Sequence, residues 1–233
     1  MNKEFDKLYE QFVHNPSSFK VGSDLIETKN NLGETLFHYF VIENCIEYAS
    51  ILLNLGAKID TVDNYHRTPL QNTAILGNSE MLRWLLKNGA DPCYQHGESG
   101  ETALFYSLSH NHHECSKILL ENENVDPNQL CKSGRSLSMS IAYSADQESY
   151  RLLHEAGAKI FEYKNSVGLS AISELVTYDN YEVLKYLLTT IEDKDINDLI
   201  LNNEFHSILL DNNKSSKLLF EAGLTGDWTG GFE

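Results

Sequence analysis

Apolar stretches recur along the chain at a nearly constant interval, and each follows a hydroxyl residue. These hydroxyl residues, separated by 33, 34, 34 and 34 positions, are Thr35, Thr68, Thr102, Ser136 and Ser170. A glutamate lies twelve positions after each of them, at Glu47, Glu80, Glu114, Glu148 and Glu182. A pair of leucines then follows, at residues 52–53, 85–86, 119–120, 152–153 and 187–188. Independent markers that share one period indicate five structural repeats.

Each repeat is predicted to form two helices joined by a turn. The hydroxyl residue can cap the first helix, because its side-chain oxygen accepts a hydrogen bond from an otherwise unpaired backbone N–H. Pro69 suits the first turn of a helix. Gly56, Gly89 and Gly157 follow the leucine pairs and suit the left-handed residue that ends a helix. The pattern therefore predicts an all-α chain of helix-turn-helix units.

The second repeat resembles the ankyrin family most clearly. It reads Arg-Thr-Pro-Leu-Gln-Asn-Thr-Ala-Ile-Leu-Gly-Asn-Ser-Glu over residues 67–80 and ends Leu-Leu-Lys-Asn-Gly-Ala-Asp over residues 85–91. The resemblance extends over about residues 30–190 and implies an all-α ankyrin-repeat solenoid of stacked units with short inter-repeat turns. The chain departs from the family pattern where the position of His38 holds other residues: Gln71, Phe105, Met139 and Ser173. We therefore expect the repeats other than the second to be less regular.

The domain organisation follows from the repeats and from the two ends. Residues 1–29 are predicted to form a capping helix and its lead-in, because apolar residues share one helical face. These are Phe5, Leu8, Phe12 and Val13. Residues 197–233 are predicted to hold a degenerate sixth repeat, a C-terminal cap and a tail, because residues 217–223 echo residues 151–157. The five repeats between them, residues 30–196, are bounded approximately at 30–62, 63–96, 97–130, 131–164 and 165–196.

The charge balance narrows the class of partner. The chain has 18 basic and 34 acidic residues, which gives a formal net charge of −16. A field of this sign repels nucleic acids and anionic membranes and attracts a protein with a basic surface. The sequence therefore predicts a protein partner, no nucleic acid and no membrane, and we expect a monomer in the absence of that partner.

Cysteine usage and the N-terminal segment favour a cytoplasmic location. The four cysteines show no CxxC spacing of the kind that indicates a disulfide or zinc framework: Cys45, Cys93, Cys115 and Cys131. Residues 1–20 carry charged side chains and no apolar run, so we expect no secretion signal. No later segment reaches membrane-spanning length.

The family resemblance implies a concave groove for the partner, formed by the inter-repeat turns and by the outward positions of each first helix. Four of these helical positions hold tyrosine, which offers a large contact area at low entropic cost and is enriched in interface hot spots. The candidate partner-binding residues are Tyr39, Glu43, Tyr65, His66, Asn72, Ile75, Leu76, Glu98, Glu101, Tyr106, His110, Tyr143, Glu174 and Tyr178.

A histidine cluster at residues 110–115 is the strongest rival candidate for chemistry. It reads His-Asn-His-His-Glu-Cys, which are zinc-binding residue types. The segment crosses the turn between two predicted helices, so its side chains diverge, and we expect surface and capping roles instead of a zinc site. On this interpretation, replacing His112 and His113 by alanine leaves the melting temperature unchanged. No GxSxG, HExxH or CxxC motif is present, so the sequence predicts no catalytic residue, no metal and no cofactor.

The sequence thus predicts a non-catalytic interaction module that binds and inhibits a partner protein. In overall plan and charge it resembles the stand-alone immunity proteins that bacteria encode beside antibacterial toxins. That resemblance implies a toxin with a basic surface as the partner. The alternative is an adaptor, or a secreted bacterial effector, that engages a host protein through the same groove.

Overall fold

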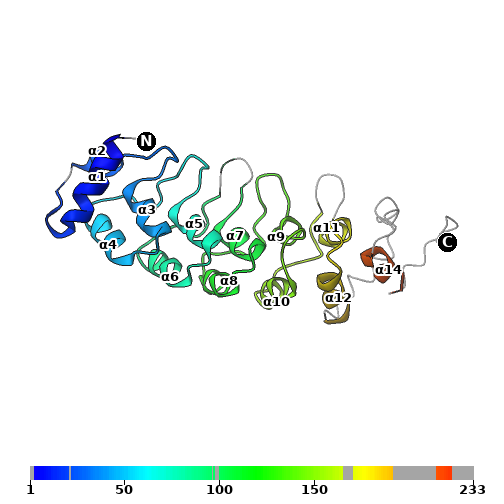
Figure 1. Ribbon diagram of the computed structural model, residues 1–233. Helices are drawn as coiled ribbons and strands as arrows, with labels where there is room; N and C mark the ends of the chain where they lie inside the picture. Colours follow the sequence, from blue (N-terminus) through cyan, green and yellow to red (C-terminus); the bar gives the residue numbers. More distant parts are fainter. Residues whose placement is uncertain are drawn as a thin grey trace. The chain divides into compact units, whose positions relative to one another are not determined.

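The computed structural model describes residues 3–20, 22–95, 97, 100–164, 170–190 and 214–221. These residues form helices joined by turns, as the repeat pattern predicts, and this part of the chain contains no strand. The chain divides into two compact units, Met1–Val125 and Asp126–Glu233, here called unit 1 and unit 2. Each unit is a stack of helical repeats (Figure 1).

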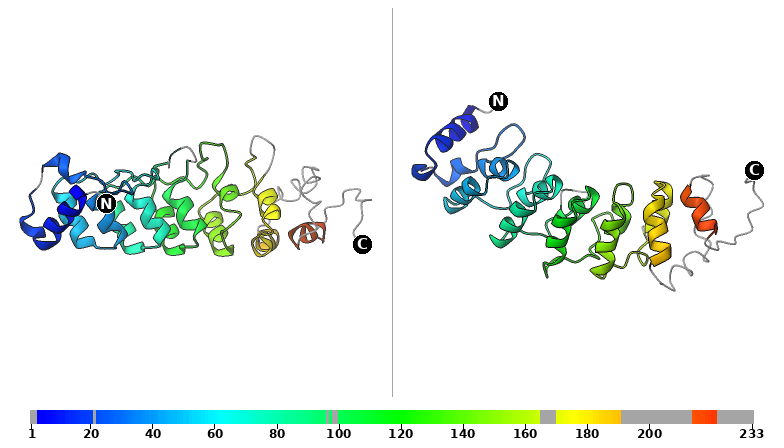
Figure 2. Two further views of the ribbon diagram at one scale, coloured as in Figure 1. Left: turned by 45° about the horizontal axis from the view of Figure 1, so that its top comes forward. Right: turned by 60° about the horizontal axis from the view of Figure 1, so that its bottom comes forward.

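Unit 1 holds three helix pairs arranged in two layers. The first helices of the pairs are α3 (Leu36–Ile42), α5 (Pro69–Leu76) and α7 (Ala103–Ser109). The second helices are α4 (Ile46–Asn54), α6 (Ser79–Lys87) and α8 (His113–Leu120). Neighbouring first helices pack against one another, and α6 packs against α8 (Figure 2). The first helices therefore form one layer and the second helices form the other.

Aromatic side chains cover the first repeat of unit 1. They come partly from the segment before it, which forms α1 (Lys3–His14), η1 (Pro16–Ser18) and α2 (Ser23–Ile26). The ring centroid of Phe12 on α1 lies 5.4 Å from those of both Phe40 and Tyr48. Tyr9 stacks on Phe40 at 5.9 Å. These rings therefore bury apolar surface of the first helix pair, as a neighbouring repeat does elsewhere in the stack.

Unit 2 holds two helix pairs and a further helix. The pairs are α9 (Leu137–Ser140) with α10 (Gln147–Glu155), and α11 (Ala171–Thr177) with α12 (Tyr181–Thr190). The helix α14 (Lys214–Glu221) packs against α11 and α12. It lies in the segment for which a degenerate sixth repeat is predicted, and the other residues of that segment lie outside the described residues.

The helix α9 is short, and its two serine side chains bond to backbone carbonyl groups. It has only four residues, of which two are serines. The Ser140 hydroxyl donates to the Ser136 carbonyl at 3.0 Å, and the Ser138 hydroxyl donates to the Ile160 carbonyl at 3.2 Å. Serine side chains that bond to nearby backbone groups weaken a helix. The irregularity expected away from the second repeat is therefore observed here.

Caps at both helix ends follow the sequence prediction. Four hydroxyl residues accept a hydrogen bond from the backbone N–H three residues further on: Thr35, Thr68, Thr102 and Ser136. Three glycines after the second helices have φ values of +98°, +92° and +80°, a region that residues with a Cβ rarely adopt: Gly56, Gly89 and Gly157. Beyond Gly56, the Ala57 N–H donates to the Leu52 carbonyl, which closes the helix end.

One leucine of each predicted pair is completely buried. These residues, Leu52, Leu85, Leu119, Leu153 and Leu187, keep the period of 33 or 34 positions. A fully buried leucine contributes roughly 2 kcal/mol relative to an exposed one. The repeated leucines therefore serve the core, and specificity for a partner must come from other positions.

A polar side chain in the first helix joins one repeat to the next. Gln71 donates from Nε2 to the carbonyl oxygens of Tyr94 and Glu101, at 3.1 and 2.9 Å. His38 has the same position in the preceding repeat and is fully buried, with Nδ1 3.1 Å from the Thr35 hydroxyl oxygen. Burial lowers the pKa of His38 from 6.5 to about 4, because the imidazolium ion cannot be hydrated there. His38 is therefore neutral in the folded chain at pH 7.

This buried histidine predicts a loss of stability in mild acid. Below pH 6.5 the unfolded chain takes up a proton that folded His38 does not accept until about pH 4, so its contribution is complete above pH 6.5 and falls as the pH drops towards 4. In His38→Gln, which copies the residue found at position 71, this component disappears. The free energy of unfolding, measured in urea, should fall between pH 7 and pH 5 by roughly 2 kcal/mol more in the wild type than in the variant. Equal losses in the two proteins would contradict a neutral, buried His38.

Candidate functional site

The C-terminal ends of the first helices carry exposed side chains. These residues, here called the helix-end positions, are Glu43, Leu76, His110, Tyr143 and Tyr178. Leu76, Tyr143 and Tyr178 keep 46%, 56% and 51% of their surface accessible, which is high for large apolar or aromatic side chains. All five are among the predicted partner-binding residues. A partner can therefore reach these five side chains directly.

The residues four positions earlier on the same helices are covered. Asn72, Tyr106 and Glu174 are buried, and Tyr39 is half-buried. Tyr39 packs edge to face on Tyr9 of α1 at 5.3 Å. The others bond to residues of the inter-repeat turns that precede the first helices. These four remain predicted contacts, but in the structure their polar groups serve the repeats themselves.

In unit 1, Asp63 organises the inter-repeat turn before α5. Its Oδ1 accepts from the backbone N–H groups of Tyr65 and Arg67, at 2.8 and 3.0 Å, and its Oδ2 accepts from Asn72 Nδ2 at 3.1 Å. Tyr65 and His66 stand exposed at the tip of this turn. The turn is therefore fixed to α5 and holds two predicted contact residues in solvent.

Tyr106 lies under an arginine that the sequence prediction did not include. The Arg67 guanidinium lies over the Tyr65 ring at 5.0 Å and over the Tyr106 ring at 5.7 Å, within the range of a cation–π interaction. The Tyr106 hydroxyl donates to Glu101 Oε2 at 2.9 Å. Burial, followed by the nearby Glu101 carboxylate, raises the pKa of Tyr106 above its usual range, so the phenol stays protonated.

A second arginine has the equivalent position in unit 2. Arg135 precedes the capping Ser136 as Arg67 precedes Thr68. Its Nη2 lies 3.0 Å from Glu174 Oε1 and donates to the Met139 carbonyl at 3.2 Å. Both arginines thus bind the covered mid-helix residue of the following repeat. Their shared position before the capping hydroxyl is the sequence signal that could have identified them.

Two other predicted residues have different environments. Ile75 is half-buried beside the exposed Leu76. Glu98 lies outside the described residues, so its predicted role stays a prediction.

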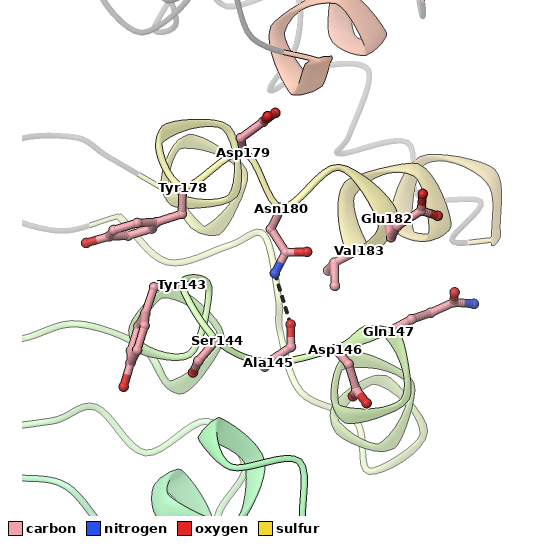
Figure 3. A pocket seen from close by; sticks show the side chains of 10 residues that line it. All are labelled: Tyr143, Ser144, Ala145, Asp146, Gln147, Tyr178, Asp179, Asn180, Glu182 and Val183. Carbon is pink, nitrogen blue, oxygen red and sulfur yellow. Dashed lines mark hydrogen bonds between the residues drawn. The ribbon is translucent and has the colours of Figure 1, made fainter.

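Unit 2 contains a groove next to its two exposed tyrosines. A depression of about 530 Å³ lies between the α9–α10 turn and the α11–α12 turn and is open to solvent. The rings of Tyr143 and Tyr178 lie side by side at its edge, with centroids 6.0 Å apart and an interplanar angle of 62° (Figure 3). Asp146, Asp179 and Glu182 are its charged lining residues. The groove therefore combines apolar rings with a negative potential.

The histidine cluster is divided among structural contacts. The His110 ring donates from Nδ1 to the Tyr106 carbonyl at 2.9 Å. The His112 ring reaches the preceding repeat, where its Nε2 donates to the Ile75 carbonyl at 2.9 Å. Because a carbonyl can only accept, Nε2 carries the proton in this tautomer. Among the described residues, no group of three His, Cys, Asp or Glu side chains is arranged to hold a metal ion.

The structure gives His112 contacts that the expectation of a neutral replacement did not include, and these contacts favour the opposite outcome. Its ring joins two repeats and lies against Gly77, where an added Cβ would be 2.5 Å from His112 Nδ1. Gly77 also has a φ of +75°, so both the backbone and the ring require glycine there. The sequence prediction missed this contact because it joins residues 37 positions apart.

Comparisons with known proteins agree with the repeat architecture. Residues 8–96 match the family model described as ankyrin repeats in three copies, and residues 99–132 match the model of a single ankyrin repeat. The mouse B-cell lymphoma 3 protein homolog is 26% identical over 163 residues, covering 67% of this chain and 36% of that protein. The ankyrin repeat, SAM and basic leucine zipper domain-containing protein 1 of Colobus guereza is 33% identical over 99 residues, or 40% of this chain and 20% of that protein.

A third relative matches over a similar span. The human SMC5-SMC6 complex localization factor protein 1 is 34% identical over 96 residues, covering 40% of this chain and 9% of that protein. The chain thus covers at most 36% of the length of these relatives.

The inter-repeat contact of His112 predicts a measurable cost. His112→Ala should lower the free energy of unfolding by roughly 1–2 kcal/mol, because the buried Ile75 carbonyl loses its donor. His112→Asn should recover part of this loss, since Asn180 at the same repeat position donates to the carbonyls of Ala142 and Ala145 at 3.1 and 2.9 Å. Urea unfolding measures both variants. Adding a chelator to the wild type should not move the midpoint, whereas a large decrease would indicate a structural metal.

Because Tyr106 is buried and Tyr143 is exposed, replacing Tyr106 should destabilise the fold much more than replacing Tyr143. Tyr106→Ala should destabilise the chain by about 3 kcal/mol, because Tyr106 is only 7% exposed. Tyr106→Phe should lose only the hydrogen bond to Glu101, or about 1 kcal/mol. Tyr143→Ala is the matched control, and its exposed ring should contribute less than about 1 kcal/mol. If thermal unfolding ranked Tyr143→Ala as the most destabilised variant, the assigned burial would be incorrect.

Proposed function

Because the chain belongs to the ankyrin-repeat family, we propose that it binds and inhibits a partner protein through its helix-end positions and inter-repeat turns. Ankyrin repeats bind other proteins, and the repeated leucines and glycines of such a stack serve its own core and helix ends. The observation that carries the proposal is the exposed Tyr143–Tyr178 pair beside an acidic groove. A cluster of exposed aromatic rings is typical of an interface hot spot.

The proposed partner has a basic surface. The net charge of −16 gives a field that attracts a positively charged protein over about one Debye length, roughly 8–10 Å in physiological salt. The carboxylates of the groove in unit 2 have the same sign as this field. Long-range attraction and the local lining therefore favour the same class of partner, and binding rather than catalysis is the role we infer.

The narrower form of the proposal is neutralisation of a bacterial toxin. It is supported by the acidity of the chain. An acidic protein that covers a basic active-site surface would inhibit by occlusion. The alternative is an adaptor or a secreted effector that engages a host protein. That alternative is supported by the name of the human relative, which describes the localisation of a complex.

We propose a cytoplasmic location and a monomeric state before binding. All four cysteines are free thiols, which suits a reducing compartment. None of the helices in the described part of the chain has the length and apolar character needed to cross a membrane.

The proposal predicts that charge and aromatic contacts affect different rate constants. A partner captured on the immobilised chain and identified by mass spectrometry would be purified and measured by surface plasmon resonance at several salt concentrations. Its association rate should rise as salt is lowered, because exposed charges steer the encounter. Tyr143→Ala and Tyr178→Ala should weaken binding by about 1–3 kcal/mol each, mainly through faster dissociation.

Glu47→Gln provides the matched surface control in unit 1, because Glu47 is exposed like Glu182 but lies outside the helix-end positions and the inter-repeat turns. It should slow association slightly and leave dissociation nearly unchanged. A partner that bound with an association rate independent of salt would contradict electrostatic attraction. Failure of the wild type to bind any protein with a Kd below about 10 μM would contradict the function itself.

A further inference from the structure

The groove in unit 2 has a fixed geometry. Asn180, just before α12, donates from Nδ2 to the carbonyls of Ala142 and Ala145 at 3.1 and 2.9 Å. These bonds connect the α11–α12 turn to the α9–α10 turn, and Figure 3 shows Asn180 between them. Tyr178 and Tyr143 extend from these two turns. The tyrosine pair is therefore pre-organised, which lowers the entropic cost of binding.

The two rings present apolar faces to solvent. Their edge-to-face arrangement, at 62° and 6.0 Å, is favourable for an aromatic pair and leaves both rings more than half exposed. The face of a tyrosine ring carries negative electrostatic potential, so it attracts a cation. A flat cation would gain both dispersion contacts and electrostatic attraction at this pair.

The charged side chains that line the groove are all acidic. Asp146 Oδ1 accepts from the Ser149 N–H at 2.9 Å, and Asp179 Oδ1 accepts from the Ser215 N–H at 2.9 Å. These bonds hold the two carboxylates in position at the groove. Glu182 is exposed at the start of α12. A cationic group that entered the groove would therefore meet a lining whose charged groups are carboxylates, with the two aromatic rings at its edge (Figure 3).

Unit 1 contains an internal example of the same combination. There the Arg67 guanidinium lies over two tyrosine rings, Tyr65 and Tyr106, and the Glu101 carboxylate bonds to the Tyr106 hydroxyl. With Arg67 over it, Tyr106 keeps only 7% of its surface accessible. Two tyrosines and a carboxylate thus accommodate an arginine in this chain.

We propose that the Tyr143–Tyr178 groove binds an arginine side chain of the partner protein. This inference rests on the proposed function, because it assigns a residue type to the partner's basic surface. The planar guanidinium can stack on an aromatic ring and donate hydrogen bonds to a carboxylate at the same time. The ammonium group of lysine is compact and more strongly hydrated, so it uses the ring faces less well.

The test uses the full chain with isotope-labelled tyrosine and does not require the natural partner. Nuclear magnetic resonance would follow the tyrosine ring signals during titration with the capped peptide acetyl-Gly-Arg-Gly-amide. Matched peptides carry lysine, or the neutral norleucine, in place of arginine. The Tyr143 and Tyr178 signals should shift saturably with the arginine peptide, and the Tyr65 ring, which already has Arg67 over it, should not.

Substitutions of single side chains measure how much each contributes to binding of the arginine peptide. Tyr143→Ala and Tyr178→Ala should each weaken arginine-peptide binding by roughly 3- to 30-fold, the range expected from loss of a cation–π contact. Glu182→Gln should weaken it by about 2- to 5-fold, whereas Glu47→Gln, which removes the same charge at the equivalent repeat position of unit 1, should have little effect. Equal shifts with lysine or norleucine would overturn the assignment to arginine, as would an unchanged affinity in both tyrosine variants.

The partner assay separates this inference from the proposed function. If the purified partner binds the wild type and the Tyr143→Ala/Tyr178→Ala double variant equally well, the groove is not its arginine site, while the binding function stands. If no partner binds the wild type, the binding function fails, and the peptide titration still decides whether the groove accepts arginine.

Discussion

A single helix pair of this chain cannot bury its own apolar surface, and the rest of the structure depends on that constraint. The leucines repeated along the second helices are fully buried, and repeats of this kind form a continuous core only by stacking on their neighbours. Stacking also brings backbone carbonyl groups into the interfaces, where they need donors. Gln71, His112 and Asn180 supply those donors with different side chains. At the first repeat, the aromatic rings around Phe12 cover the apolar surface.

Stacking also decides which side chains remain available for a partner. The mid-helix residues Tyr106 and Glu174 are buried, and an arginine from the preceding repeat contacts each of them. A residue at the end of the same helix as Glu174, Tyr178, is exposed. The usable surface is therefore narrower than the outward face of each helix, and in unit 2 it is concentrated at one tyrosine pair.

The features that depend on local geometry could be predicted from the sequence. A capping threonine, a left-handed glycine and a leucine at a fixed interval have the same role in every repeat, so their spacing predicted the helices and the all-α stack. The features that depend on neighbours could not. The contact of Arg67 with Tyr106 and the contact of His112 with Ile75 each join residues of two adjacent repeats. Their chemistry depends on the residue that the adjacent repeat supplies, which no single-repeat pattern specifies. The exposure of Tyr143 was predicted, but its pairing with Tyr178 joins two neighbouring repeats.

The residue before each capping hydroxyl gives the repeats a fixed order. In the first four repeats this position holds Glu34, Arg67, Glu101 and Arg135, so its charge alternates, and in the fifth it holds Leu169. In unit 1, Arg67 lies over the tyrosine that Glu101 holds by a hydrogen bond. Precise loss of the second repeat by recombination would leave the 34-residue periodicity intact, yet it would place the repeat of Glu34 next to that of Glu101 and remove the cation between them. Repeats that look interchangeable by their leucines are thus distinguished by charge, which restricts how this array can lengthen or shorten during evolution.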